Sequence, residues 1–381
     1  MSYAIQEIFS KYYSDYKDKY GINFELDKIA RAIISCKTNE LGGHSSICDD
    51  CKLTTNHYNS CRNRHCPCCQ SLVKEKWIDK RKSEVVNAPY FHVVFTVPAE
   101  LRPLFYSNKK LFYTLLYKTV KETLLTLGKD KKYLGADIGF MSILHTFGQN
   151  LSYHPHLHCI ALGGGLTKDL KFKQSKDDFL FPVRAISKLF RGKFLDAFNK
   201  LYAKNKIVFP KELIHLNDQK EFNKFKDSLY KKEWVPHIKE TFKGAGNVIE
   251  YLGRYTHRIA ISNSRIVKIT DEGVTFKVKD YKTGNHELLT LHPVEFIRRF
   301  LMHVLPKGFT KIRHYGILSN RTKKVKLTIC RNFLKGTHPK SELDGLSIPE
   351  IIQKLFNVDI LSCKKCGSKK LSKSYLQTKT E

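Results

Sequence analysis

The sequence lacks any apolar run long enough to cross a membrane as a helix. No segment approaches the ~18 uninterrupted apolar residues that a membrane-spanning helix requires. The N-terminal residues MSYAIQEIFSKYYSDY also lack the basic start and the apolar core of a secretory signal peptide. These absences favour a cytoplasmic protein, in which cysteines are expected to be metal ligands or free thiols and not disulfides.

Acidic residues are too few to balance the basic ones. The chain carries 36 Asp and Glu against 67 Lys and Arg, which gives a formal net charge of +31. This excess favours a polyanion, and we expect nucleic acid as the partner, bound through phosphate contacts. No basic amphipathic helix stands out, which argues against a membrane surface. The sequence also contains no Walker-type phosphate loop, so no ATP site is expected.

The apolar patterning predicts a mixed α+β fold. With 381 residues, of which 41% are hydrophobic, the chain is long enough for two or three domains. Runs of β-branched and aromatic residues predict strands, and apolar positions at helical spacing predict helices. Helices are expected over residues 1–35, 70–86, 108–127 and 245–257, and a helical stretch with breaks near Pro182 and Pro210 is expected over 184–232. The expected strands cover 90–98, 139–147 and 156–162, and a hairpin covers 274–291.

Two closely spaced cysteine pairs predict a zinc site. Cys48 and Cys51 form one Cys-x-x-Cys pair, and Cys66 and Cys69 form another, within the segment CDDCKLTTNHYNSCRNRHCPCC. Each pair can place two thiolates on one ion, so the two pairs together complete a tetrahedral zinc site. A site with four protein ligands has no open coordination position, so its expected role is structural.

Other potential ligands lie near this site or at the C-terminus. Possible further zinc ligands are Cys61, His65, Cys68 and His44, together with the pair Cys363 and Cys366, which looks like half of a zinc ribbon. Core packing is expected for the isolated cysteines Cys36, Cys159 and Cys330. Arg62 and Arg64 lie inside the cysteine segment and are candidate DNA-binding residues.

The segment HPHLHCIALGGG places histidines at alternate positions, His154, His156 and His158. Alternate residues of a strand point to the same face, so the three imidazoles can line one surface. Pro155 cannot donate a ladder hydrogen bond, so we expect the regular strand to begin after it, with His156 and His158 as the secure pair. The triplet Gly163–Gly165 is expected to form a tight turn after the strand.

Two kinds of chemistry fit this strand. The string His-Pro-His-Leu-His resembles the histidine-triad nucleotide hydrolases, in which one histidine attacks a phosphate. His156-Leu157-His158 also resembles the histidine–hydrophobic–histidine motif of single-strand DNA nicking enzymes, in which the pair binds a divalent cation and a separate tyrosine attacks. That cation, Mg²⁺ or Mn²⁺, needs a third ligand. Gln149 is the first choice, and the alternatives are His154, His145 and His257.

Two tyrosines could supply the nucleophile that the nicking chemistry needs. In VIEYLGRYTHRIAIS, Tyr251 and Tyr255 are four residues apart and would lie on one face of the expected helix. A phenol has a pKa near ~10, so it needs a nearby metal or cation to become a good nucleophile. Arg254 and Arg258 are the expected cationic groups that would contact the phosphates.

Six motifs follow one another along the chain, namely LGGHSSICDDC, YNSCRNRHCPCC, FHVVFTVPAELR, HTFGQNLSYHPHLHCIALGGG, VIEYLGRYTHRIAIS and IRHYGILSN. In this order they resemble the two-tyrosine rolling-circle transposases of the insertion-sequence-ninety-one family, over most of residues 30–320. The resemblance implies an antiparallel-sheet core of the HUH (histidine–hydrophobic–histidine) endonuclease type. The expected segments are a helical zinc-binding module over 1–78, this core over 79–262, a small α/β extension over 263–345, and a basic tail over 346–381.

The resemblance implies a transposase that nicks single-stranded DNA. One tyrosine, Tyr251 or Tyr255, would attack a phosphodiester at a transposon end and leave a 5′-phosphotyrosine and a free 3′-hydroxyl. Strand transfer by a rolling-circle-like mechanism would follow, with Mg²⁺ or Mn²⁺ as the catalytic ion and Zn²⁺ as the structural ion. The expected partners are transposon ends and target DNA, in a bacterial cytoplasm at the nucleoid. The alternatives are a plasmid replication initiator or relaxase, a histidine-triad hydrolase, and a zinc protein that only binds DNA.

Overall fold

The chain forms two compact units. The computed structural model describes residues 4–176, 180–242, 253, 260–279, 284–335 and 340–376. Unit 1 comprises Met1–Lys80, His257–Val304 and Ser341–Glu381, and unit 2 comprises Arg81–Thr256 and Leu305–Lys340. Helices and antiparallel strands occur in both units, which confirms the mixed class of the fold. Within the described ranges, no helix is long and apolar enough to cross a membrane.

Unit 2 is built on an antiparallel sheet of six strands, with the order β11-β4-β5-β3-β7 and with β6 paired to β5. The strands are β3 (Tyr90–Thr96), β4 (Asp137–Phe147), β5 (Tyr153–Leu166), β6 (Phe172–Gln174), β7 (His237–Phe242) and β11 (Ile312–Gly316). β3, β4 and β5 are almost wholly buried. Their β-branched and aromatic composition explains both their strand conformation and their central position.

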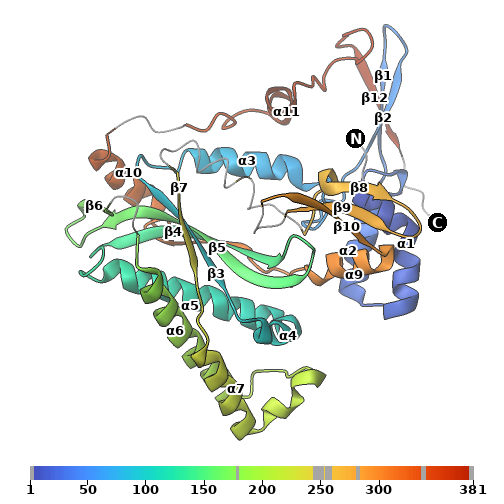
Figure 1. The fold of residues 1–381 in the computed structure, drawn as a ribbon. Helices are drawn as coiled ribbons and strands as arrows, with labels where there is room; N and C mark the ends of the chain where they lie inside the picture. Colours follow the sequence, from blue (N-terminus) through green and yellow to red (C-terminus); the bar gives the residue numbers. More distant parts are fainter. Residues whose placement is uncertain are drawn as a thin grey trace. The chain divides into compact units, whose positions relative to one another are not determined.

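Helices cover one face of this sheet (Figure 1). The helices of unit 2 among the described residues are the 3₁₀ helix Ala99–Leu101, α4 (Arg102–Ser107), α5 (Lys109–Lys129), α6 (Val183–Ala203), the 3₁₀ helix Lys211–Asn217, α7 (Gln219–Lys231) and α10 (Lys323–Phe333). α5 packs on β4 and β5 and also on α6. The ring of Phe95 on β3 meets the ring of Phe190 on α6 with centroids 5.0 Å apart. Each fully buried side chain of this kind contributes about 1.5–3 kcal/mol.

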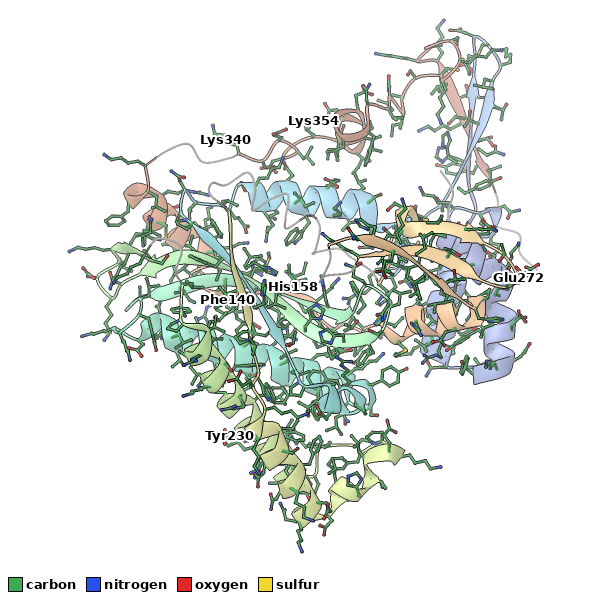
Figure 2. The ribbon with its side chains drawn as sticks, in the orientation of Figure 1. Phe140, His158, Tyr230, Glu272, Lys340 and Lys354 are labelled. Carbon is green, nitrogen blue, oxygen red and sulfur yellow. The ribbon has the colours of Figure 1, made fainter. Side chains whose placement is uncertain are left out.

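The strand register gathers histidines on the opposite face of the sheet. His156 of β5 pairs with His145 of β4, and Ile160 of β5 pairs with His92 of β3. Paired residues of an antiparallel sheet share a face, and so do alternate residues of one strand. His92, His145, His156 and His158 therefore share one face of three adjacent strands. Figure 2 labels one residue from each face, His158 and Phe140.

The glycine triplet Gly163–Gly165 lies inside β5, so the expectation of a turn after the strand is wrong. A Cβ atom on Gly165 would lie 2.5 Å from the backbone oxygen of Asp137 on β4. A Cβ atom on Gly164 would lie 2.5 Å from the ring of Phe172 on β6. The triplet thus lets the neighbouring strands approach β5 closely, which is a known use of glycine within a sheet.

The start of β5 also differs from the prediction. The strand begins at Tyr153 and therefore includes Pro155. The ladder between β4 and β5 shifts register between His145 and Phe147, opposite this part of β5. β3 ends its pairing with β5 at His156, so it offers Pro155 no partner. A proline is tolerated where the ladder is irregular in this way, because no regular hydrogen bond depends on its missing N–H.

Gly165→Ala is expected to lower the free energy of unfolding by about 1–3 kcal/mol, because the added methyl group meets backbone atoms that cannot move without opening the β4–β5 pair. The measurement is the midpoint of urea unfolding. Gly192→Ala is the matched control, because Gly192 lies in helix α6 with nothing within 4 Å of its Cβ position. This control should leave the midpoint unchanged or raise it. Equal effects of the two substitutions would contradict the account of Gly165.

Unit 1 combines segments that are far apart in the sequence. Among its described residues, the helices are α1 (Ala4–Tyr20), α2 (Phe24–Ile34), the 3₁₀ helix Asn39–Leu41, α3 (Gln70–Lys82, whose last two residues belong to unit 2), the 3₁₀ helix Asn263–Arg265, α9 (Pro293–Met302) and α11 (Ile348–Phe356). α1 packs against α9, where the rings of Phe9 and Phe300 lie 5.3 Å apart. The hydroxyl of Tyr12 donates to the carboxylate of Asp271 at 2.6 Å. The N-terminal helices therefore share a core with residues near position 300.

Two small antiparallel sheets lie in the part of unit 1 that the structure describes. One has the order β10-β9-β8 and the other has the order β12-β1-β2. The strands are β8 (Ile266–Ile269), β9 (Val274–Lys279), β10 (His286–Leu291), β1 (Gly43–Cys48), β2 (Thr54–Tyr58) and β12 (Leu371–Leu376). Figure 1 shows β12, near the C-terminus, beside β1. Glu342 and Leu343, which precede β12 in the sequence, donate their backbone N–H groups to the buried carboxylate of Asp79 on α3.

Candidate metal centres

Eight cysteines gather in two clusters within unit 1. Among the described residues, the first cluster contains Cys36, Cys61, Cys66 and Cys69, and the second contains Cys48, Cys51, Cys363 and Cys366. Within each cluster the Sγ atoms lie within 4.8 Å of one another. The prediction that Cys48, Cys51, Cys66 and Cys69 share one ion is therefore corrected. Each of the two Cys-x-x-Cys pairs finds its partners elsewhere in the chain.

The first cluster joins two helix ends. Cys36 follows α2, and Cys69 immediately precedes α3. The Sγ atom of Cys69 lies 3.5 Å from the Sγ atoms of both Cys36 and Cys61. Four thiolates at ~2.3 Å from a tetrahedral zinc ion stand about 3.8 Å apart, so this cluster fits zinc. The expectation that Cys36 only packs in the core is corrected, whereas Cys159 and Cys330 are buried as predicted.

Only some of the other predicted zinc ligands belong to the two cysteine clusters. Cys61, Cys363 and Cys366 belong to the clusters. In the described part of the chain, His65 and Cys68 belong to neither cluster, although His65 is buried. Arg62 and Arg64 are exposed on the loop between Cys61 and Cys66, and their DNA contacts stay a prediction. The signal that sequence reasoning missed was the position of Cys36 at the end of a predicted helix.

A third cluster lies on the histidine-bearing face of the unit 2 sheet. The ring nitrogens of His145, His156 and His158 lie within 4.8 Å of one another, and all three residues are buried. The Nε2 atoms of His156 and His158 are 2.9 Å apart. Two nitrogens bound at ~2.1 Å to adjacent positions of an octahedral cation stand about 3.0 Å apart, so the pair fits such a cation.

Hydrogen bonds to the far ring nitrogens orient the pair. The Nδ1 atom of His156 lies 2.6 Å from the backbone oxygen of His154, so Nδ1 carries the proton and Nε2 keeps its lone pair. The Nδ1 atom of His158 lies 2.8 Å from the Nε2 atom of His92. Such partners fix the tautomer and the ring orientation of metal-binding histidines. The side chain of His154 turns elsewhere, to the guanidinium of Arg102 at 2.9 Å.

Burial keeps the imidazoles of His156 and His158 in their neutral form. Burial lowers the pKa of His156 to about 4, with a smaller contribution from His154. Burial also lowers the pKa of His158 well below its usual value, and the neighbouring His145 adds to this effect. Both imidazoles are therefore neutral near pH 7, which is the form that binds a metal ion.

The register favours His145 over Gln149 as the third group. His145 pairs directly with His156, whereas Gln149 lies in the turn beyond the pair formed by Phe147 and Tyr153. That pair is two residues along the strand from His145, a distance of about 7 Å. The choice of Gln149 stays a prediction, and His145 was among the alternatives to it. The register of the β4–β5 hairpin, which places His145 opposite His156, is the signal that ranks His145 first.

The predicted tyrosine helix falls almost wholly outside the described residues. Tyr251, Tyr255, Arg254 and Arg258 lie outside the described residues, as does the alternative ligand His257. Their roles therefore stay predictions.

Two family models match the sequence. A model described as "Transposase zinc-binding domain" matches residues 8–97, and one described as "Putative transposase" matches residues 139–326. The first range contains all four cysteines of the Cys36 cluster, and also Cys48 and Cys51. The second range contains the three clustered histidines of β4 and β5.

Two curated relatives align with most of the chain. "Putative transposase y4qJ" of Sinorhizobium fredii (strain NBRC 101917 / NGR234) is 43% identical over 348 residues, which are 91% of this chain and 85% of the relative. "Transposase for insertion sequence element IS801" of Pseudomonas savastanoi pv. phaseolicola is 26% identical over 357 residues, which are 91% of this chain and 83% of the relative. No solved structure matches the chain.

Proposed function

Because the chain belongs to the IS91 (insertion-sequence-ninety-one) family of transposases, we propose that it nicks single-stranded DNA at transposon ends and transfers the strand by a rolling-circle-like mechanism. The observation that carries the proposal is the approach of the Nε2 atoms of His156 and His158 on a sheet within the matched transposase region. Under this proposal the unit 2 sheet is an HUH endonuclease core. Its reactions on DNA use no ATP.

The three clustered imidazoles have the donor set for a divalent ion. We assign His156 and His158 as two ligands and His145 as the third, with Mg²⁺ or Mn²⁺ as the ion. When bound, the ion would polarise the scissile phosphate. The protein contributes neutral ring nitrogens and fixes their direction through the His154 carbonyl and the His92 ring. These contacts hold the ligands in place before DNA arrives.

The nucleophile in the proposal is the phenolic oxygen of Tyr251 or Tyr255. It forms a bond to phosphorus while the bond from phosphorus to the 3′-oxygen breaks. The phenolic proton leaves to solvent, and the 3′-oxygen takes up a proton to become a free 3′-hydroxyl. Arg254 and Arg258 balance the phosphate charge. Because the phosphotyrosine bond keeps the energy of the broken phosphodiester, a 3′-hydroxyl can later attack it and release the tyrosine.

A gel assay tests the proposal. The protein is incubated with labelled single-stranded DNA that carries the transposon ends, together with Mn²⁺, and is resolved on a denaturing gel. We expect a covalent protein–DNA band that EDTA abolishes, and no such band with fully duplex DNA. A histidine-triad hydrolase would instead hydrolyse nucleotides without metal and without an adduct. A protein that only binds DNA would retain the oligonucleotide under native conditions but leave it intact.

His92→Ala is expected to weaken Mn²⁺ binding by about 10–100-fold, because the Nδ1 atom of His158 loses its partner. The measurement is the Mn²⁺ concentration that gives half-maximal adduct formation. His92→Gln is the conservative control, since an amide group can reach the position of the lost Nε2 atom and should restore much of the affinity. Excess Mn²⁺ should rescue the alanine variant. An alanine variant with unchanged Mn²⁺ dependence would show that His92 does not position His158.

A further inference from the structure

The pair Cys48–Cys51 lies in the N-terminal part of the chain, and the pair Cys363–Cys366 lies near its C-terminus. The two pairs are nevertheless in contact. The Sγ atoms of Cys51 and Cys363, 312 positions apart in the sequence, lie 3.5 Å from each other. The Sγ atoms of Cys48 and Cys366 are also 3.5 Å apart. The match to the zinc-binding domain ends at residue 97, so it does not include the C-terminal pair. The partner of the N-terminal pair thus lies outside the recognised zinc domain.

The N-terminal pair sits in a tight loop between β1 and β2. The N–H of Lys52 donates to the carbonyl oxygen of Cys48 at 2.9 Å, and the N–H of Cys48 donates to the carbonyl oxygen of Leu53 at 3.0 Å. Lys52 has a φ of 57°, in the left-handed region. This backbone path curls the residues from Cys48 to Cys51 so that both Sγ atoms face the same point.

The C-terminal pair has the same loop geometry. The N–H of Gly367 donates to the carbonyl oxygen of Cys363 at 2.9 Å, and the N–H of Cys363 donates to the carbonyl oxygen of Ser368 at 2.8 Å. Gly367 has a φ of 73° and occupies the position that Lys52 occupies in the first loop. Two loops with the same hydrogen bonds therefore face each other, each presenting a Cys-x-x-Cys pair. Paired loops of this kind suit one tetrahedral zinc ion.

The sheet that carries these loops has little apolar core of its own. Most residues of β2 and β12 are exposed, including Tyr375, which is 93% exposed. β12 nevertheless pairs with β1 along six residues, from Leu371 opposite Cys48 to Leu376 opposite Gly43. A three-stranded sheet that buries so little surface needs another source of stability. Metal binding by four thiolates can supply it.

We infer that Cys48, Cys51, Cys363 and Cys366 form a second structural zinc site, which closes the β12-β1-β2 sheet by joining the C-terminal strand to the N-terminal module. This site is distinct from the one formed by Cys36, Cys61, Cys66 and Cys69, whose ligands all lie within residues 36–69. Only the second site depends on the C-terminal residues. Zinc at this site therefore controls whether β12 stays attached, whereas zinc at the first site does not.

Zinc content tests the inference without reference to DNA cleavage. The full chain purified under reducing conditions should hold two zinc ions per molecule, measured by inductively coupled plasma mass spectrometry. The double variant Cys363→Ser/Cys366→Ser should hold one. Cys68→Ser is the matched control, because Cys68 lies beside the first cluster but outside both, and it should keep two ions. Cys366→His should also keep two, since imidazole can replace a thiolate in a zinc site.

Trypsin digestion gives a second readout, which reports the attachment of β12. Five lysines around the C-terminal loop and strand are exposed, namely Lys364, Lys365, Lys369, Lys370 and Lys373. In the zinc-loaded chain these sites should be cleaved more slowly than in the Cys363→Ser/Cys366→Ser variant. A protease can bind and cleave this segment only when β12 is detached from the sheet. Circular dichroism that matches the parent would show that the rest of the variant is folded. Two zinc ions in the double serine variant, or equal cleavage rates in the two proteins, would overturn the inference.

Discussion

Replacing both Tyr251 and Tyr255 with phenylalanine is expected to abolish the covalent protein–DNA adduct. The loss should be at least about 1,000-fold, because phenylalanine offers no oxygen to attack the phosphodiester and nothing else in the proposed mechanism forms the bond. The measurement is the intensity of the adduct band with labelled single-stranded transposon ends and Mn²⁺. DNA retention on a native gel should change little, since the substitution removes no charge.

Single substitutions separate the roles of the two tyrosines. Tyr251→Phe and Tyr255→Phe should each keep part of the adduct, because the remaining phenol can still make one cleavage. The variant with the larger loss identifies the tyrosine that acts first on that end. Tyr230→Phe is the control, since Tyr230 is an exposed tyrosine on α7 and has no role in the proposal (Figure 2). A double variant that still forms the adduct as well as the parent would refute the assignment of the nucleophile.

Removing the imidazoles that we propose as metal ligands is expected to cause the second large loss of adduct formation. His156→Ala or His158→Ala should each lower adduct formation by at least about 100-fold, because each leaves the proposed ion with one strong ligand fewer at a buried site. The loss should appear at low Mn²⁺ concentration and be reduced only in part by excess Mn²⁺. The binding of Mn²⁺ to the protein without DNA, followed by electron paramagnetic resonance, should weaken in parallel.

The measurement of Mn²⁺ binding by electron paramagnetic resonance also distinguishes His145 from Gln149 as the third ligand. Because His145 faces His156 across the β4–β5 pair, His145→Ala should weaken Mn²⁺ binding, whereas Gln149→Ala should change it little. His237→Ala is the control on the same sheet, because His237 is an exposed histidine on β7. The reverse ranking, with Gln149→Ala the more damaging, would favour the prediction of Gln149 from the sequence. No effect of either His156→Ala or His158→Ala would remove the metal site from the proposal.

Local pattern accounts for the secondary structure that could be predicted. Strand β3 was predicted from its run of β-branched and aromatic residues, and helix α5 from its apolar periodicity, because both signals arise from neighbouring residues. The prediction of a turn at the glycines near the end of β5 is wrong. Their role depends on strands β4 and β6 that approach from other parts of the chain, and single-sequence patterns carry no record of such neighbours.

Chemistry was also predictable from the sequence where the spacing is short. Cys48 with Cys51, and His156 with His158, are predicted as ligand pairs because two residues of one loop or strand must lie close to each other, and the structure places each pair in a candidate metal cluster. The family followed from the order of such motifs, and the relatives confirm it. The sequence by itself thus determined the short-range pairs of candidate metal ligands and the transposase family.

Only the tertiary structure decided which pairs share a site. Cys48 and Cys51 face Cys363 and Cys366 because β12 pairs with β1, and His145 joins the histidine pair because of the β4–β5 register. The cysteine contacts join residues that are more than 300 positions apart in the sequence. Many loop paths can close such a contact at similar entropic cost, so sequence separation alone does not select one. The hydrogen bonds of the sheets and the packing within each unit make that selection.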